Sequence, residues 1–474
     1  MRREKEKGRA NPMAMSAEER QQMLLTQPVE KIIPKMALPT ICSMLITSIY
    51  NMADTYFVSQ IGTAEATASG TSASAAVGIV FSVMAMIQAL AFMFGMGSGT
   101  NVSHLLGMGK RKEAEVYSAV GFFSAVAAGV IAVLGNVFNE PLMRLLGATE
   151  TAMPYALDYA RYIFLAAPFM MGSLSMNNLL RFQGLATYGM VGIISGGLLN
   201  MLLDPLLIFV FDMGIAGASI ATAISQLTSF VILLVMCSTH ADAITIHPRN
   251  YRPTKQMYAK ILNNGLPSLG RQGIMSVSTS LLNNAAAVYG DPAIAAFAIV
   301  SRCLNFVNST VVGFGQGFQP VCGFNYGARK YDRMHRAFSF SVKVTTIVLL
   351  VLGAAGFAFA EPVVTLFRRS DPEVIRIGTE TFRVQILTVW TWGFITLSNM
   401  YTQAIGYGIR STILAAARQG LFLIPTLLVL PNVWGLRGLE VCQPLADVLT
   451  LALAVWMMTK VIRAQKAQMA QETA

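Results

Sequence analysis

FGMGSGTNVSHLLGMGKRK, residues Phe94–Lys112, recurs later in the chain as FGQGFQPVCGFNYGARKYD, residues Phe314–Asp332. The two stretches align at an offset of 220 residues, which pairs Gly95 with Gly315, Gly97 with Gly317 and Gly107 with Gly327. A second pair, FNEPLMRLLG (Phe138–Gly147) and FAEPVVTLFR (Phe359–Arg368), follows at an offset of 221. The chain is therefore built from two similar halves.

The composition of the chain is that of a membrane protein. Of its 474 residues, 54% are hydrophobic and 12% are charged, and the mean hydropathy is +0.54. Soluble domains carry about 25% charged residues. Apolar runs of about 18 or more residues recur along the chain, as expected of bilayer-spanning helices, and the alternating strands of a barrel are not visible. These patterns predict an all-α membrane protein.

We expect twelve transmembrane helices, six in each half. The predicted spans lie near residues 34–61, 66–106, 113–138, 155–180, 188–211, 215–238, 258–289, 292–326, 332–360, 373–404, 410–431 and 436–462. Because each half has six spans, the two copies share one orientation and are related by an axis along the membrane normal. Two such pseudo-symmetric six-helix lobes around a central cavity are a transporter architecture.

The polar stretches divide this chain into five parts. We expect a disordered cytoplasmic N-terminus (residues 1–28) and an N-lobe (29–239). A cytoplasmic inter-lobe linker (240–256), a C-lobe (257–463) and a cytoplasmic tail (464–474) should follow. The first segment has no apolar core, so it is not a signal peptide. Met1, Met13 and Met15 are alternative starts of translation.

The basic residues gather in the short loops, as around Lys110, Arg252 and Arg333. This distribution is the positive-inside pattern, and it places these loops and both termini in the cytoplasm of a cell whose plasma membrane holds the protein. The net charge of +11 therefore reflects topology, not a nucleic-acid partner. We expect a monomer in the lipid bilayer. The five cysteines lie singly, in no spacing that indicates a disulfide framework or a metal site.

Polar side chains interrupt the apolar segments of the N-lobe. LNMLLDPLLIFVFDMGIAGASIATAISQ (Leu199–Gln226) carries Asn200 and Asp204 four residues apart, which places them on one helix face. Asp54 lies deep in the first span, and Asn51 precedes it by one turn. A carboxylate inside a membrane helix is costly and usually faces the bundle interior, where it serves function. The two acids are therefore candidate functional groups.

In several motifs the chain resembles the multidrug and toxic compound extrusion (MATE) transporters, over nearly all of its length. ALPTICSMLITSIYNMADTYFVSQIG (Ala37–Gly62) looks like the first helix of that family. LLRFQG (Leu179–Gly184), LNMLLDPLLIF and MGIAGASIATAISQ look like its fourth to sixth helices. Within the family the chain is most similar to the DinF-like prokaryotic branch. The resemblance implies a multidrug exporter that exchanges organic, often cationic, amphipathic substrates for H⁺ or Na⁺ by alternating access.

The resemblance also implies a coupling site in the N-lobe. The residues at the matching positions, with Asn51 added from the same helix face, are Asp54, Asn51, Asn200, Asp204 and Thr222. The other prokaryotic branch carries an acid on its seventh helix. Here residues 258–289 contain no acid, and the first one that follows is Asp291. A cation site in the C-lobe is therefore not expected.

Two ions remain open as the coupling ion. Two carboxylates in one low-dielectric site cannot both ionise cheaply, so the pair can accept a proton. With oxygens of Asn200 and Thr222, Asp54 and Asp204 also form a candidate Na⁺ site. Na⁺ takes about five or six oxygens and about four can be named, so we favour H⁺. The alternative to a functional role is that Asp54 is a structural acid, hydrogen-bonded to Asn51 or Thr55. Apart from the coupling ion, we expect no cofactor.

Pro39 lies in the first span, five residues after Pro34. A proline removes a helical hydrogen bond, so a static kink is one interpretation. The other is that protonation of the two acids bends the helix at Pro39 and narrows the N-lobe pocket.

Candidate substrate-pocket residues lie on and just after the fourth span, namely Tyr159, Met176, Asn177, Asn178 and Gln183. Amides can orient a substrate, and methionine side chains adapt to varied shapes. Asp447, in the stretch QPLADVL of the last span, is interpreted as structural. Arg271, in or near the seventh span, is assigned no role.

Two other functions are alternatives to export. A flippase for lipid-linked precursors, in the same superfamily, would carry extra spans or a strongly cationic central cavity, and neither is evident. An intramembrane enzyme would need Asp-rich Mg²⁺ motifs or His-Glu-x-x-His, and the sequence has neither. It also lacks a GxxxxGK[ST] motif, so ATP does not drive this chain directly. We expect a transporter without enzyme activity.

Overall fold

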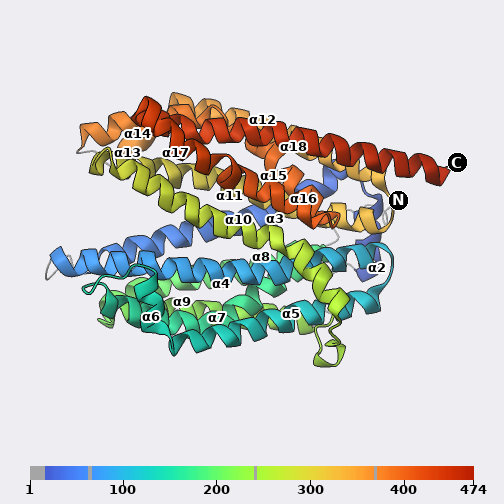
Figure 1. Cartoon of the computed structure of the whole chain (residues 1–474). Coiled ribbons are helices and arrows are strands. Elements are labelled where there is room, and N and C mark those ends of the chain that lie inside the picture. Colours follow the sequence, from blue (N-terminus) through green and yellow to red (C-terminus); the bar gives the residue numbers. More distant parts are fainter. Residues whose placement is uncertain (1–15, 62–66, 240–242, 368–370, 474) are drawn as a thin grey trace, which may run out of the picture.

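The computed structural model of the chain describes residues 16–61, 67–239, 243–367 and 371–473, and its regular structure in these ranges is helical. Figure 1 shows two bundles of long helices side by side, the N-terminal half below and the C-terminal half above. Helix α2 and the end of α18 lie at the same end of the molecule. The prediction of an all-α protein with two lobes is confirmed.

The N-lobe contains six long helices and several short ones. The long helices are α3 (Val29–Ser59), α4 (Thr67–Gly107), α5 (Arg111–Val133), α7 (Met153–Phe182), α8 (Ala186–Pro205) and α9 (Gly214–Thr239). The short elements are α2 (Ala17–Thr26), the 3₁₀ turn η3 (Leu134–Asn136), α6 (Asn139–Leu145) and the π-helical turn η4 (Leu206–Val210).

The C-lobe follows the same order after the 3₁₀ turn η5 (Pro248–Asn250). Its first helices are α10 (Lys255–Ala287), α11 (Asp291–Gly327), α12 (Tyr331–Ala358) and α13 (Ala360–Phe367). They are followed by α14 (Pro372–Ile386), α15 (Val389–Ala404), α16 (Gly408–Ala416), the π-helical turn η6 (Ala417–Leu421), α17 (Leu423–Trp434) and α18 (Leu436–Thr473).

Ten helical segments of the described chain are long and apolar enough to cross a membrane. Two further segments stand where the sequence predicts the seventh and tenth spans. Helix α10 is long but more polar, since it carries Arg271 and Gln272. The tenth is divided at Leu387–Thr388 into α14 and α15, of 15 and 16 residues. Either piece alone is shorter than the roughly 20 residues that a span needs.

The sequence analysis expected residues 1–28 to be disordered, and for the described part of this segment that expectation is wrong. Residues 17–26 form α2, because Ser16 and Glu19 make a reciprocal capping box at its start. The Leu24 side chain is fully buried in the hydrophobic core of the C-lobe. The prediction for residues 1–15 lies outside the described residues.

The other predicted boundaries also fall on ordered chain. Residues 240–242 of the linker lie outside the described residues, but the next part is held against the N-lobe. The backbone N–H of Ile244 donates to Oε1 of Gln183 at 2.7 Å, and Nη2 of Arg111 donates to the Ala243 carbonyl at 3.1 Å. Helix α18 runs on to Thr473, so residues 464–473 of the predicted tail extend the last helix.

The repeated glycines bring the lobes together. A Cβ on Gly107 would lie 2.2 Å from the carbonyl oxygen of Phe324, and one on Gly327 would lie 2.1 Å from that of His104. Only glycine permits so close an approach of two backbones. Phe324 follows His104 by the same 220 residues that separate Gly327 from Gly107, so one contact is made twice. It joins α4 to α11 at the end of the molecule where α3 begins.

Candidate functional site

A cavity inside the N-lobe is lined by polar side chains from several apolar helices. It is bordered by α3, α4, α7, α8 and α9, and Gln316 of α11 completes it. The space between the lining atoms is about 1060 Å³, counting the part open to solvent. Its polar lining residues are Thr40, Ser43, Thr47, Tyr50, Asn51, Asp54, Gln88, Asn177, Arg181, Asn200, Thr222, Ser225, Gln226, Ser229 and Gln316.

Each bordering helix lines the cavity with a single face. On α7 the lining residues are Met170, Leu174, Asn177 and Arg181, spaced four, three and four residues apart. This spacing follows the 3.6-residue period of an α-helix, so these side chains form one stripe. The stripe is apolar at one end and carries an amide and a guanidinium at the other.

Asp204 is fully buried at one end of the cavity. Its Oδ1 accepts a hydrogen bond from Nδ2 of Asn200 at 3.2 Å, and the same nitrogen lies 3.4 Å from Oγ1 of Thr222. Its Oδ2 is buried and has no hydrogen-bond partner among the described residues. The four-residue spacing of Asn200 and Asp204 thus gives a carboxylate with one oxygen held and one oxygen available.

Asp54 of α3 stands close enough to Asp204 for the two carboxylates to interact electrostatically. Its Oδ1 is also buried without a hydrogen-bond partner in the described part of the chain. The hydroxyl of Thr55 donates instead to the carbonyl oxygen of Asn51, at 2.9 Å. The structural alternative, in which Asn51 or Thr55 holds this carboxylate, therefore does not account for Oδ1.

Two adjacent glycines let α8 fit between α3 and α9 at this point. A Cβ on Gly197 would lie 3.0 Å from the ring of Tyr50, and one on Gly196 would lie 3.0 Å from the Ser225 carbonyl oxygen. The close approach brings Asp204 toward Asp54 on one side and toward Thr222 on the other. Pro205 ends α8 directly after the acid, and the π-helical turn η4 follows. Such turns are frequent at functional sites.

Two of the predicted pocket residues lie at or near the cavity, but only one of them lines it. Asn177 lines it, as expected. Tyr159 does not line it but is buried beside the acids, where its hydroxyl is within bonding reach of Thr222. It therefore belongs to the surroundings of the carboxylates, not to the substrate-accessible wall.

The other three pocket candidates lie away from the cavity wall. Met176 packs in a hydrophobic cluster of the N-lobe, because it points to the opposite side of α7 from the stripe. Nδ2 of Asn178 donates to the Leu174 carbonyl at 2.7 Å, and its Oδ1 accepts from Arg181. Gln183 follows the end of α7, where its side chain binds the inter-lobe linker.

Arg181 is the charged side chain among the lining residues that were not predicted from the sequence. Its side chain is 1% exposed, yet it borders the cavity from the last turn of α7. The signal was present in the sequence, since Arg181 follows Asn177 by four residues and so shares its helix face. The sequence-based prediction named Asn177 from this face but not Arg181.

Helix α3 runs without a break through Pro34 and Pro39. Because Pro39 has no N–H, it leaves one helical carbonyl unpaired inside the helix. One turn later, the Ser43 hydroxyl donates to the Pro39 carbonyl at 3.0 Å. Thr40, the residue after Pro39, donates a hydrogen bond from its hydroxyl to the carbonyl of Gly313 on α11 at 2.6 Å. The proline thus lies where α3 contacts the other lobe.

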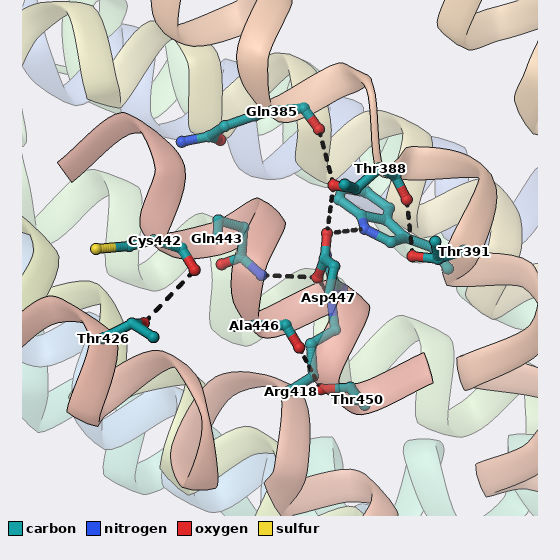
Figure 2. Close-up of polar contacts among 11 residues, drawn as sticks. Gln385, Thr388, Thr391, Arg418, Thr426, Cys442, Gln443, Ala446, Asp447 and Thr450 are labelled. Atoms are coloured by element: carbon teal, nitrogen blue, oxygen red, sulfur yellow. Dashed lines mark hydrogen bonds and ion pairs between the residues drawn. The ribbon is translucent and has the colours of Figure 1, made fainter. Parts of the chain in front are cut away.

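Asp447 of α18 has the opposite character from the two N-lobe acids (Figure 2). Its Oδ1 accepts from Nε of Arg418 at 2.7 Å and from Nε2 of Gln443 at 3.0 Å. Its Oδ2 accepts from Oγ1 of Thr388 at 3.0 Å and from Nε1 of Trp392 at 2.7 Å. Arg418 ties α18 to η6, and Thr388 and Trp392 tie it to the break between α14 and α15 and to α15 itself. These contacts are those of a structural acid.

Two pseudo-symmetric helical lobes, with a polar cavity buried in one of them, define a polytopic membrane transporter. The MatE family model matches residues 39–206 and 267–428, and the chain belongs to this family.

Among curated proteins, the multidrug export protein MepA of Staphylococcus aureus (strain MSSA476) is 27% identical over 412 residues, covering 87% of this chain and 89% of MepA. A MATE transporter solved in complex with MaL6 is 25% identical with a TM-score of 0.88, covering 94% of this chain and 99% of that one. An outward-facing multidrug resistance MATE transporter is also 25% identical, with a TM-score of 0.87 and coverage of 94% and 98%.

Proposed function

We propose that this protein is a multidrug exporter, which exchanges organic, often cationic, amphipathic compounds for H⁺ or Na⁺ by alternating access. The observation that carries the proposal is a pair of acids at one end of the cavity, Asp54 in its wall and Asp204 buried one helical turn beyond the lining residue Asn200. Each has a buried oxygen that lacks a hydrogen-bond partner among the described residues. Family membership and the similarity to MepA support drug export as the activity. The flippase alternative has no comparable support.

The geometry supports a simple exchange at the two acids. Asn200 holds Oδ1 of Asp204, so Oδ2 is the atom that can take up a proton. Protonation removes the cost of a buried negative charge, whereas a cationic substrate in the cavity favours the ionised form. Substrate and proton therefore compete for one site, as antiport requires.

The orientation of Asn200 supports H⁺ over Na⁺. Its amide nitrogen faces both Asp204 and Thr222, so it acts there as a donor and not as a cation ligand. Na⁺ is bound by oxygen atoms, and its binding would require this amide to turn. Because Asn200 holds Oδ1 of Asp204, the two carboxylates and the Thr222 hydroxyl leave about four oxygens, fewer than the five or six that Na⁺ takes.

Export across the plasma membrane requires one end of the molecule to face the cytoplasm. We propose that the end with α2, η5 and the close of α18 is cytoplasmic, because the basic loops gather there. We also propose that one chain is sufficient for transport, since it contains both six-helix lobes of the transporter architecture.

The proposal is tested by efflux of a fluorescent cationic dye from proteoliposomes under imposed H⁺ or Na⁺ gradients. The wild-type protein is compared with Asp204→Asn, and with Asp158→Asn as a matched control. Asp158 lies on α7, is exposed and does not border the cavity. Gradient-driven efflux should be lost in Asp204→Asn only. Efflux that survives this substitution would remove the coupling site proposed here.

A further inference from the structure

Arg181 is a buried cation with incomplete pairing. Its Nη2 donates to Oδ1 of Asn178 at 2.6 Å, but Nε and Nη1 are buried and have no hydrogen-bond partner among the described residues. The Phe182 ring lies 5.1 Å from the guanidinium carbon, which offsets only part of the lost hydration. Two donors of a permanent charge thus remain unsatisfied at the wall of a cavity.

No acid of the described chain forms an ion pair with Arg181. Its hydrogen-bond partner, Asn178, is neutral. The charged side chain that acts on it most strongly is Arg271 of α10, a second cation. A buried charge without a counterion is costly, and proteins usually supply a partner. Here the partner has to come from what enters the cavity.

The two acids are too far away to be that partner. Ala186 and Asn200 both border the cavity, and the 14 residues from one to the other along α8 rise about 21 Å. Arg181 lies one turn of chain before Ala186, whereas Asp204 lies one helical turn beyond Asn200. The guanidinium and the carboxylates therefore stand at opposite ends of the cavity, and one drug-sized molecule does not reach both.

We propose that Arg181 is the side chain of this pocket that binds the acidic group, a carboxylate, of an amphipathic substrate. The inference rests on the proposed function and names the residue that would recognise such a group, at the end of the cavity away from the two acids. Guanidinium donors form strong, charge-assisted hydrogen bonds with carboxylate oxygens. Asn177, one turn before Arg181 on the same face, adds an amide to this end of the cavity.

The same oxyanion chemistry could be provided by the phosphate of a lipid head group. To tell a lipid phosphate from a substrate carboxylate, binding of phosphatidic acid is measured as a second probe. The primary probes are a xanthene dye with a free carboxylate and the methyl ester of the same dye. These two dyes differ only in the group that Arg181 is proposed to recognise.

Binding of both dyes to the purified protein in detergent is measured by fluorescence anisotropy. Arg181→Gln should weaken binding of the carboxylate dye roughly tenfold or more and leave the ester unchanged. Arg181→Lys keeps the charge and should give an intermediate loss. Arg161→Gln is the matched control, since Arg161 lies on the same helix, is exposed and does not border the cavity. It should change neither affinity.

Equal weakening of both dyes, or no change for either, would overturn the inference. So would Arg181-dependent binding of phosphatidic acid in a protein that does not distinguish the two dyes. Size-exclusion chromatography identifies a variant that fails to fold, and Arg181→Lys then takes its place. No ion gradient is present, so failure of this test is separate from failure of coupled export, which the Asp204→Asn experiment reports.

Discussion

Nδ2 of Asn200 lies 3.2 Å from Oδ1 of Asp204, and the second carboxylate oxygen is buried with no hydrogen-bond partner in the described parts of the chain. The C-lobe does not repeat this arrangement. At the offset of 220 residues, Gly420 and Ile424 stand where Asn200 and Asp204 stand in the N-lobe. Both lobes nevertheless place a π-helical turn in this region. The two lobes therefore share the same arrangement of helices, but only the N-lobe has an acid at this position.

Substrate binding should release protons from the N-lobe acids. A saturating cationic dye, added to wild-type protein in weakly buffered detergent near neutral pH, should release up to about one proton per molecule, because the pair shares one proton. A pH-sensitive indicator measures the release. Asp204→Asn should abolish it and Asp158→Asn should not. Undiminished release from Asp204→Asn would contradict competition at this site.

Pro39→Ala should uncouple transport without loss of folding. Alanine supplies the N–H that proline lacks, which stiffens α3 where it contacts Gly313 of the other lobe. We expect the unfolding midpoint in detergent to hold or rise, while proton-driven dye efflux falls at least severalfold. Pro34→Ala is the control on the same helix. Full proton-coupled efflux by Pro39→Ala would exclude bending of α3 at this proline as part of the mechanism.

Asp447→Asn should destabilise the fold, in contrast to Asp204→Asn. Arg418 is 15% exposed and stacks over Trp392, with 4.0 Å between its guanidinium carbon and the ring centre. Removing its counterion leaves a buried charge unpaired, at a cost of about 3–5 kcal/mol.

Thermal unfolding in detergent measures the difference between these two substitutions. A marked drop in the midpoint is expected for Asp447→Asn and little change for Asp204→Asn, which removes an oxygen that has no partner. The double variant Arg418→Met, Asp447→Leu should recover part of the loss. Equal effects of the two single substitutions would show that full pairing does not separate a structural acid from a coupling acid.

Gly107→Ala and Gly327→Ala should destabilise the protein by similar amounts. Each new Cβ would fall on a carbonyl oxygen of the opposite lobe, so the backbones have to separate, at a cost of about 1–3 kcal/mol. Gly78→Ala is the control, because nothing lies within 4 Å of its Cβ position. Thermal unfolding compares the three. A large difference between Gly107→Ala and Gly327→Ala would contradict the symmetry of the contact.

The sequence predicted the architecture because its signals are local and repeated. Hydropathy marks ten of the spans, and the duplicated glycine motif reports the two lobes directly. The segments that hydropathy marks poorly are α10, which carries polar residues, and the pair α14–α15, whose polar residues bind partners on α18. Thr388, at the break between α14 and α15, bonds to Asp447, 59 residues later. No local pattern predicts that pairing.

The carboxylate site was predictable for the same reason. Asn200 and Asp204 are neighbours on one helix, and a buried acid stands out in an apolar segment. The pocket wall was predicted less well, because each helix lines it with one face and the sequence does not say which. On α7, Asn177 was found and Arg181 was missed, while Met176 was named although its side chain packs into a hydrophobic cluster. Choosing the face requires the partners of α7, which belong to other helices.

The reciprocal contact of Gly107 with Phe324 and of Gly327 with His104 has a consequence for the origin of the chain. A patch that meets its own copy across a two-fold axis is how identical subunits form dimers. A half-length chain with six spans would therefore have had the surface to assemble with itself. Fusion of two such copies removed the need for them to stay identical. One half could then keep a carboxylate that faces residues of its own lobe, and the other half could lose it.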